Sequence, residues 1–257
     1  MQQREFDLYL QRARKFQERL NRHLFFETIP LTAEVRHSVE PIPFAERLNG
    51  EFRPIREGEK WGDSWDSGWF RLTAELPQEW AGRPLALRIG LGGEAMLFDE
   101  AGVPKFGFSA GSVFGPHYRK ELYQLPENRA GKTVEFWVEA AANALFGVAM
   151  NADPEPHPYG KCDATAEVMR IGWFNRELWL LTLDLEVLLD LLNVLPPRCR
   201  RADLIVSAVS RAADAFAESP ANAAKARAEL VPVLDKRANA SAMTAVGLGH
   251  AHIDTGW

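Results

Sequence analysis

The stretch Val246-Gly247-Leu248-Gly249-His250-Ala251-His252-Ile253-Asp254-Thr255-Gly256-Trp257 changes from apolar to polar near its middle. Thr244, Val246 and Leu248 alternate with small residues, which predicts a buried strand with neighbours on both faces. Polar side chains follow where the apolar residues stop, and ligands of α/β sheets bind beyond the carboxyl ends of strands. The stretch therefore predicts a buried strand with a candidate ligand site at its carboxyl end.

The spacing of polar residues in this stretch favours a metal ion. His252 and Asp254 are two residues apart, so an extended backbone points both side chains to the same side. An imidazole nitrogen and a carboxylate oxygen are both ligands that zinc accepts. His250 has the same phase, so spacing alone does not choose among the three. A strand end whose polar side chains bond to the backbone is the alternative without a metal.

Residues 249–257 resemble the segment that opens the catalytic domain of glycoside hydrolase family 38, the zinc-dependent α-mannosidases. In the bacterial and cytosolic branch of that family the segment commonly reads G-H-A-H-I-D-T-A-W, and Gly256 is the one departure. The resemblance implies that His252 and Asp254 are zinc ligands and that Trp257 is an aromatic wall of the sugar subsite. It gives His250 no ligand role.

The enzyme that this resemblance implies is a retaining glycosidase. One Asp attacks the anomeric carbon to give a covalent glycosyl-enzyme, and a second carboxyl acts as acid and then as base. The resemblance places both, with the remaining zinc ligands, later in the catalytic domain. We therefore expect no catalytic residue in these 257 residues, only part of a zinc site, and no hydrolysis of α-mannosides by this chain alone.

Composition bounds the class of protein. A hydrophobic fraction of 46% and a charged fraction of 25% are ordinary for a globular protein of 257 residues. The net charge of -5 gives no case for a nucleic-acid or membrane partner. Cys162 and Cys199 form no disulfide framework, and the chain starts without an apolar signal segment, so we expect a cytoplasmic protein. The expected partners are an α-mannoside oligosaccharide and the rest of the catalytic domain, and a homo-oligomer is left open.

The first part of the chain predicts a helix followed by a connector. Apolar residues recur at helical spacing over residues 4–24, with charged residues on the other face. The segment from Thr28 to Glu57 carries several prolines and no sustained period, which indicates an ordered connector.

From about 60 to 170 the pattern predicts a β-sandwich of jelly-roll type. Apolar residues alternate over 70–76, 85–91 and 134–138, and Asp99-Glu100-Ala101-Gly102 reads as a hairpin turn. The sandwich resembles the amino-terminal part of the same α-mannosidase branch. That resemblance is carried by Trp61-Gly62 with Trp65, Trp69-Phe70-Arg71, Glu94-Ala95 with Asp99, and Glu139-Ala140-Ala141-Ala142-Asn143-Ala144-Leu145-Phe146-Gly147.

After about 170 the pattern becomes helical. Leucines repeat at spacings of three and four over 178–195 and end at Pro196-Pro197, and a second helix is predicted over 205–216. Ser219-Pro220 predicts a capped helix start, with an alanine-rich helix running on to about Lys236. The fold class is therefore α+β. The expected parts are the helix and connector (1–58), the sandwich (59–170), a helical segment (171–241) and the first strand of a truncated α/β catalytic domain (242–257).

Several isolated features carry weaker signals. Trp61, Trp65 and Trp69 lie near two aspartates and could stack on sugars, although the glycines beside them favour packed loops. His117, in a polar loop, could contact a sugar or the catalytic domain, but a surface histidine without such a role is the favoured explanation.

Two alternative functions stay open from the sequence. A different metallohydrolase would use His250 and His252 as an H-x-H pair, but this leaves the sandwich and Trp257 unexplained. A non-catalytic sandwich that binds carbohydrate or packs against a partner is the second alternative. It gains weight if the protein has no further catalytic part.

Overall fold

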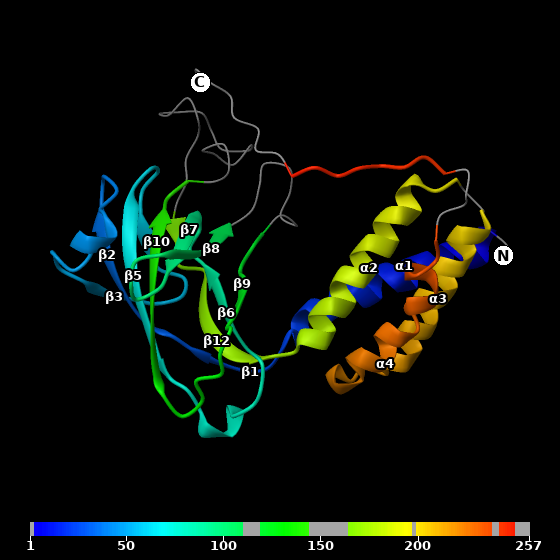
Figure 1. The fold of residues 1–257 in the computed structure, drawn as a ribbon, viewed down its shortest axis with the longest axis horizontal. Helices are drawn as coiled ribbons and strands as arrows, with labels where there is room; N and C mark the ends of the chain where they lie inside the picture. The colour runs from blue at the N-terminus through cyan, green and yellow to red at the C-terminus, as the bar shows by residue number, and fades with distance from the viewer. Residues whose placement is uncertain (1–2, 110–118, 144–163, 197–198, 238–241, 250–257) are drawn as a thin grey trace, which may run out of the picture. The chain divides into compact units, whose positions relative to one another are not determined.

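A computed structural model describes residues 3–109, 119–143, 164–196, 199–237 and 242–249. The chain forms two compact units, one spanning Arg19–Trp179 and the other combining Met1–Glu18 with Leu180–Trp257. The first unit holds the strands and the second holds most of the helical residues (Figure 1). The predicted α+β class, with an amino-terminal helix, an antiparallel jelly-roll sandwich and then helices, is confirmed.

Two antiparallel sheets of the described residues make the sandwich. The four-stranded sheet has the order β1 (Phe25–Pro30), β12 (Val168–Phe174), β6 (Leu85–Gly90) and β9 (Leu122–Gln124). The six-stranded sheet has the order β3 (Arg53–Ile55), β2 (Thr32–Ser38), β5 (Ser67–Glu75), β10 (Thr133–Ala141), β7 (Glu94–Phe98) and β8 (Pro104–Ser109). A short pair joins β11 (Ala164–Thr165) to β4 (Lys60–Gly62). Three short 3-10 helices lie between these elements. Asn21–His23 follows α1, Phe44–Glu46 precedes β3, and Gln78–Trp80 follows β5.

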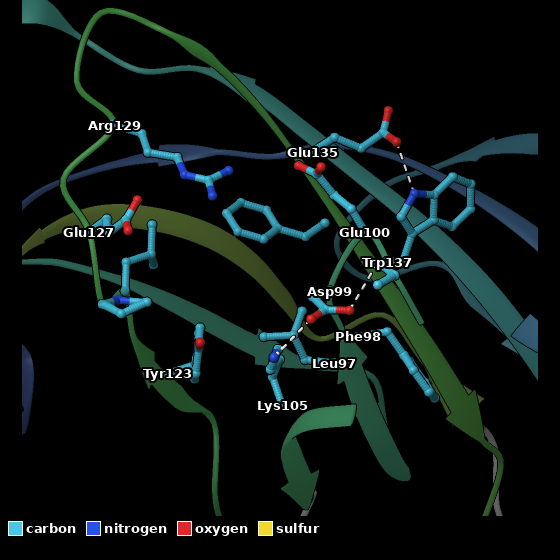
Figure 2. Close-up of a pocket in the computed structure, with 14 residues that line it drawn as sticks. Leu97, Phe98, Asp99, Glu100, Lys105, Tyr123, Glu127, Arg129, Glu135 and Trp137 are labelled. Atoms are coloured by element: carbon cyan, nitrogen blue, oxygen red, sulfur yellow. Dashed lines mark hydrogen bonds and ion pairs between the residues drawn. The ribbon is translucent and has the colours of Figure 1, made fainter. Parts of the chain in front are cut away.

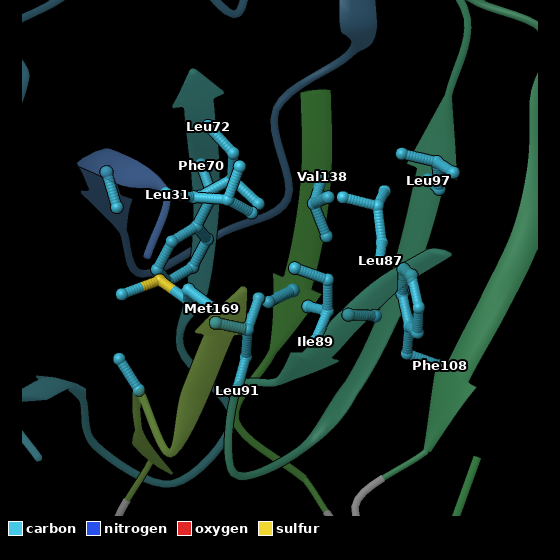
Figure 3. Close-up of a cluster of buried hydrophobic side chains, with 14 of the residues drawn as sticks. Leu31, Phe70, Leu72, Leu87, Ile89, Leu91, Leu97, Phe108, Val138 and Met169 are labelled. Carbon is cyan, nitrogen blue, oxygen red and sulfur yellow. The ribbon is translucent and has the colours of Figure 1, made fainter. Parts of the chain in front are cut away.

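The alternation seen in the sequence places one face of each strand in a shared core. Phe70 and Leu72 of β5 are fully buried and pair across the sheet with Val138 and Phe136 of β10. Leu87 of β6 comes from the other sheet, and its side chain lies in the same cluster (Figure 3). Burying one such side chain contributes about 1.5–3 kcal/mol, so this cluster holds the two sheets together.

The expectation of a connector from Thr28 to Glu57 is wrong for much of that segment. The end of β1 and the whole of β2 and β3 lie within it. β1 pairs with β12 from Phe25↔Phe174 to Pro30↔Arg170, and β2 pairs with the central strand β5. The prolines in this segment do not exclude strands, because Pro30 occupies the last position of an edge strand, where a missing N–H is tolerated.

The helices lie in the segments that the sequence predicts to be helical. They are α1 (Gln3–Leu20), α2 (Arg176–Val194), α3 (Arg200–Phe216), α4 (Ala223–Ala228) and α5 (Val231–Leu234). In the helical unit, the rings of Phe16 and Phe216 lie 5.5 Å apart, and Arg12 donates to Ser210 at 2.8 Å. An ion pair between Arg227 and Asp184, at 2.7 Å, joins α4 to α2.

The predicted cap at Ser219 and the long alanine-rich helix are both corrected. Pro220 does open a helical turn, Pro220–Asn222, but the Ser219 side chain makes no capping hydrogen bond. Its backbone carbonyl accepts from Asn222 N–H instead, at 2.9 Å. The alanine-rich segment breaks between α4 and α5 because Pro232 has no N–H to continue the helical bonding.

The predicted strand over Thr244–Leu248 does not form in the described part of the chain. Residues 242–249 have no assigned strand, and Val246 and Leu248 are 77% and 83% exposed. The alternation was read correctly, but a strand needs a neighbour to satisfy its backbone groups, and none of the sheets described above includes this segment. No helix of the described residues is both long enough and apolar enough to cross a membrane.

Candidate functional site

The structure does not place the residues predicted for the metal site. His252, Asp254 and Trp257, together with His250, lie outside the described residues. His117 and Cys162 lie outside them as well. Within the described ranges, no group of three or more His, Cys, Asp or Glu side chains could hold a metal ion.

A cavity of about 470 Å³ opens at the edge of the sandwich. Both sheets contribute to it, the four-stranded sheet through β9 and the six-stranded sheet through β7, β8 and β10 (Figure 2). It is lined by Leu97, Phe98, Asp99, Glu100, Ala101, Lys105, Tyr123, Leu125, Pro126, Glu127, Arg129, Glu135, Phe136 and Trp137. This volume falls in the range of small-molecule sites, about 300–1,000 Å³.

The β7–β8 hairpin forms one side of the cavity and is held by Asp99. Its Oδ1 atom accepts from the N–H groups of Ala101 and Val103 at 3.0 and 2.8 Å, which is the turn predicted from the sequence. Its Oδ2 atom lies 2.8 Å from Nζ of Lys105. The hydrogen bond from Lys105 and the one from Val103 N–H hold the pKa of Asp99 below its usual range. Asp99 is therefore ionised and fully used by the hairpin.

On β10, Glu135 has a structural role too. Its Oε1 atom accepts from the Trp137 indole N–H at 2.8 Å, and Oε2 accepts from Arg71 Nε at 2.8 Å. The guanidinium of Arg47 lies over the Trp137 ring, 4.6 Å from its centroid. These contacts fix the outer wall of the cavity.

Three charged side chains at the rim have no such role. Glu100, Glu127 and Arg129 are exposed and form no side-chain hydrogen bond or ion pair within the described part of the chain. Figure 2 shows Glu127 and Arg129 on the side opposite to the hairpin. No sequence pattern indicated this cavity, because Glu127 and Arg129 belong to a loop without periodicity.

The loop that carries Glu127 and Arg129 is held by the residue between them. The side-chain amide of Asn128 donates to the backbone carbonyls of Trp80 and Arg83 at 2.8 and 2.7 Å, and its Oδ1 accepts from Ala130 N–H. Gly131 follows with φ +72° and donates its N–H to Leu76 O. The backbone between Glu127 and Arg129, and just after Arg129, is therefore fixed.

The three tryptophans singled out in the sequence have different environments. Trp61 and Trp69 are 3% and 1% exposed, and their indole N–H groups donate to Leu91 O and Ile42 O. These two rings are buried within strands β4 and β5, so they do not form a stacking surface for a sugar. Trp65 is 49% exposed, and its φ of +74° is unusual for a residue other than glycine. Hydrogen bonds between Trp65 N–H and Ala142 O, and between Ala142 N–H and Asp66 O, hold this turn.

Glu139, in the six-stranded sheet, is half-buried, and its carboxylate takes part in none of the ion pairs described above. Its cross-strand neighbours are Trp69 and Met96, and it has no side-chain hydrogen bond or ion pair among the described residues. Burial raises the pKa of Glu139 above its ordinary value of 4.5.

Comparison with known protein families identifies the sandwich. The sequence profile of the jelly roll domain of alpha-mannosidases matches residues 29–165. The chain is 25% identical to alpha-mannosidase 2C1 of Homo sapiens over 225 residues, which is 85% of this chain and 21% of that protein. It is 24% identical to alpha-mannosidase G of Dictyostelium discoideum over 233 residues, 87% of this chain and 20% of that protein. The chain thus spans about a fifth of the length of these relatives.

Among solved structures, a Ruminococcus gnavus beta-glucuronidase is similar with a TM-score of 0.39 and 11% identity. The match covers 56% of this chain and 27% of that one.

Proposed function

The chain belongs to the alpha-mannosidase family, and we propose that it is the amino-terminal part of a zinc-dependent retaining enzyme that hydrolyses terminal α-mannosides of oligosaccharides. The observation that carries the proposal is the match of the jelly roll domain to residues 29–165. The resemblance stated from the sequence to family 38 is confirmed, since the relatives align over most of the chain. The zinc, the mechanism and the substrate are the parts that we propose.

We assign the zinc ligands of this chain to His252 and Asp254. The donor set fits zinc in kind, because it consists of an imidazole nitrogen and a carboxylate oxygen. Zinc, when bound, supplies a positive charge that can hold sugar hydroxyls and favour ring distortion. In this proposal Trp257 packs against a sugar ring, and neither His252 nor Asp254 transfers a proton.

We propose further that the 257 residues alone hydrolyse no α-mannoside. The nucleophile and the acid of a retaining glycosidase are a pair of carboxylates. The family resemblance assigns both to a later part of the catalytic domain. Losing such groups typically costs several orders of magnitude in rate. We also propose a cytoplasmic location, because the cysteines offer no disulfide framework and Cys199 is a free thiol whose Sγ atom accepts from Ala202 N–H.

The experiment compares three substitutions in a full-length α-mannosidase that carries this chain at its amino end. We expect His252→Ala and Asp254→Ala each to lose bound zinc and activity on an aryl α-mannoside. His250→Ala is the matched control, and we expect its effect to stay within about 10–100-fold, as for residues that only support a ligand. Loss of zinc in His250→Ala with zinc retained in His252→Ala would reverse the assignment. Strong zinc-dependent turnover by the 257-residue chain would contradict the proposed inactivity.

A further inference from the structure

We infer that the cavity between the β7–β8 hairpin and the β9–β10 loop is a binding site for a neutral oligosaccharide, separate from the zinc-dependent chemistry. The choice of mannosides as the ligand rests on the proposed function, whereas the site itself rests on the geometry of the sandwich. The cavity of about 470 Å³ has walls from both sheets, so it belongs to the folded jelly roll and not to a single loop.

The charges of the lining argue for a neutral ligand with many hydroxyl groups. Four carboxylates and two cations line the cavity: Asp99, Glu100, Glu127, Glu135, Lys105 and Arg129. The excess of carboxylates disfavours phosphates and other anions, which require a positive site. A divalent cation is disfavoured too, because no three of the described acidic or histidine side chains form a possible metal site. Hydroxyl groups donate to carboxylates and accept from guanidinium groups, so a sugar can use both kinds of side chain.

The polar groups divide into those that build the cavity and those that remain for a ligand. Asp99 and Glu135 already bond to Lys105, Arg71 and backbone or indole N–H groups through both carboxylate oxygens, so they fix the walls. Glu127 and Arg129 have no partners of their own within the described residues. Because Asn128 fixes the loop between them, the carboxylate and the guanidinium are presented at the rim with little backbone freedom to lose on binding.

The floor of the cavity is aromatic. Phe136 and Tyr123 are half-buried and pack against the hydrophobic core, which holds their rings in place. The Tyr123 ring packs against the Phe106 ring, with ring centroids 5.3 Å apart. A pocket lined by aromatic side chains with a few polar groups at its rim is the usual form of a small-ligand site. The apolar C–H face of a pyranose ring fits such a floor.

The experiment measures binding of α-1,2-linked mannobiose to the 257-residue chain by calorimetry and by mapping of amide chemical shifts. We expect a dissociation constant in the millimolar range, with shifts concentrated at residues 123–137 and 97–105. Arg129→Ala and Glu127→Gln should each weaken binding about fivefold, as expected for losing one hydrogen bond to a charged group at an exposed rim. The unfolding midpoints of both variants should stay close to that of the parent chain, because neither side chain forms a hydrogen bond or ion pair within the described residues.

The matched controls are Arg56→Ala and Glu79→Gln. Both residues are exposed in the same unit, and neither lines the cavity, so their affinity for mannobiose should equal that of the parent. Absence of binding, or equal weakening by the control pair and the cavity pair, would overturn the site. Tighter binding of mannose 6-phosphate than of mannobiose would overturn the neutral ligand. None of these results depends on zinc or on turnover, so failure of this site and failure of the proposed enzymatic function are distinguishable.

Discussion

The Nε2 atom of His37 lies 2.7 Å from the Oδ2 atom of Asp66, which joins β2 to the turn before β5. The same carboxylate accepts from Asp63 N–H at 2.8 Å. Burial alone would raise the pKa of Asp66, but these hydrogen bonds and the charges of His37 and Lys60 bring it below the ordinary value of 3.8. Because the folded-state pKa is depressed, the stabilisation is present above about pH 4 and is lost as the pH falls through the folded-state pKa.

Replacing Asp66→Asn should therefore lower the free energy of unfolding at pH 7 by about 1–2 kcal/mol, as expected for charged hydrogen bonds. The difference from the parent chain should shrink as the pH falls below about 4, because the unfolded chain takes up the proton first and the folded Asp66 carboxylate takes it up only at lower pH. Urea unfolding followed by tryptophan fluorescence at pH 7 and pH 3 measures both values. Asp63→Asn is the control, because its side chain is 77% exposed and its ion pair with Lys60 should contribute less than about 1 kcal/mol. Equal losses at both pH values would contradict the ionic origin.

Because Trp65 has a positive φ, a glycine variant at this position should be more stable than an alanine variant, the reverse of the usual order. Left-handed backbone costs an L-residue about 1–2 kcal/mol, which exceeds the entropic cost of glycine of about 0.5–1 kcal/mol. Trp65→Gly should therefore be more stable than Trp65→Ala by about 0.5–1 kcal/mol, since both lose the same side chain. Thermal and urea unfolding of the two variants make the comparison. A more stable alanine variant would show that the turn relaxes to negative φ.

Replacing Glu139 with the neutral residue glutamine should stabilise the sandwich. Its folded-state pKa is raised by burial, so folded stability falls as the pH rises above about 4.5, where the unfolded chain releases the proton first. Glu139→Gln should raise the free energy of unfolding at pH 7 on the order of 1 kcal/mol, with no gain below pH 4. Glu135→Gln, in the same strand, should instead destabilise, because it weakens the bonds to Arg71 and Trp137. The same sign for both substitutions at pH 7 would contradict this account.

Hydrogen exchange should separate the core of the sandwich from the end of the described chain. Val134 and Val138 of β10 are almost fully buried, and both pair with β5, while Val138 also pairs with β7. Met243, Val246 and Leu248 are largely exposed and belong to no strand. Exchange of amide protons should therefore be slow at 134–138 and fast at 243–249. Similar protection in the two segments, measured by mass spectrometry, would count against the exposed ending.

The elements that the sequence predicted well are those whose pattern is local. The alternation around Phe70 and Leu72 and the leucine repeat of α2 follow from one face being buried, and both elements are found as expected. The Asp99 turn was predicted because its side chain bonds to backbone only two and four residues away. In each case the residues that determine the structure lie within a few positions of one another in the sequence, so the pattern alone reveals it.

The elements that were missed depend on distant partners. β2 lies within the proline-containing segment that was predicted to be a connector, and it forms a strand because it pairs with β5. The rim of the cavity depends on Asn128, whose partners at Trp80 and Arg83 no spacing rule could supply. The predicted zinc ligands at His252 and Asp254 lie outside the described residues, so their assignment stays a prediction.

The place of β12 between β1 and β6 has a consequence for the order of folding during synthesis. β1 is translated before every other strand of the described sandwich, whereas β12, its neighbour in the four-stranded sheet, is translated after all of them. Until Val168–Phe174 emerges, the apolar residues of β1 and the open edge of β6 have no covering strand. The nascent sandwich therefore exposes apolar side chains and an unpaired strand edge for most of its translation. Chaperones bind such states, and chains aggregate from them.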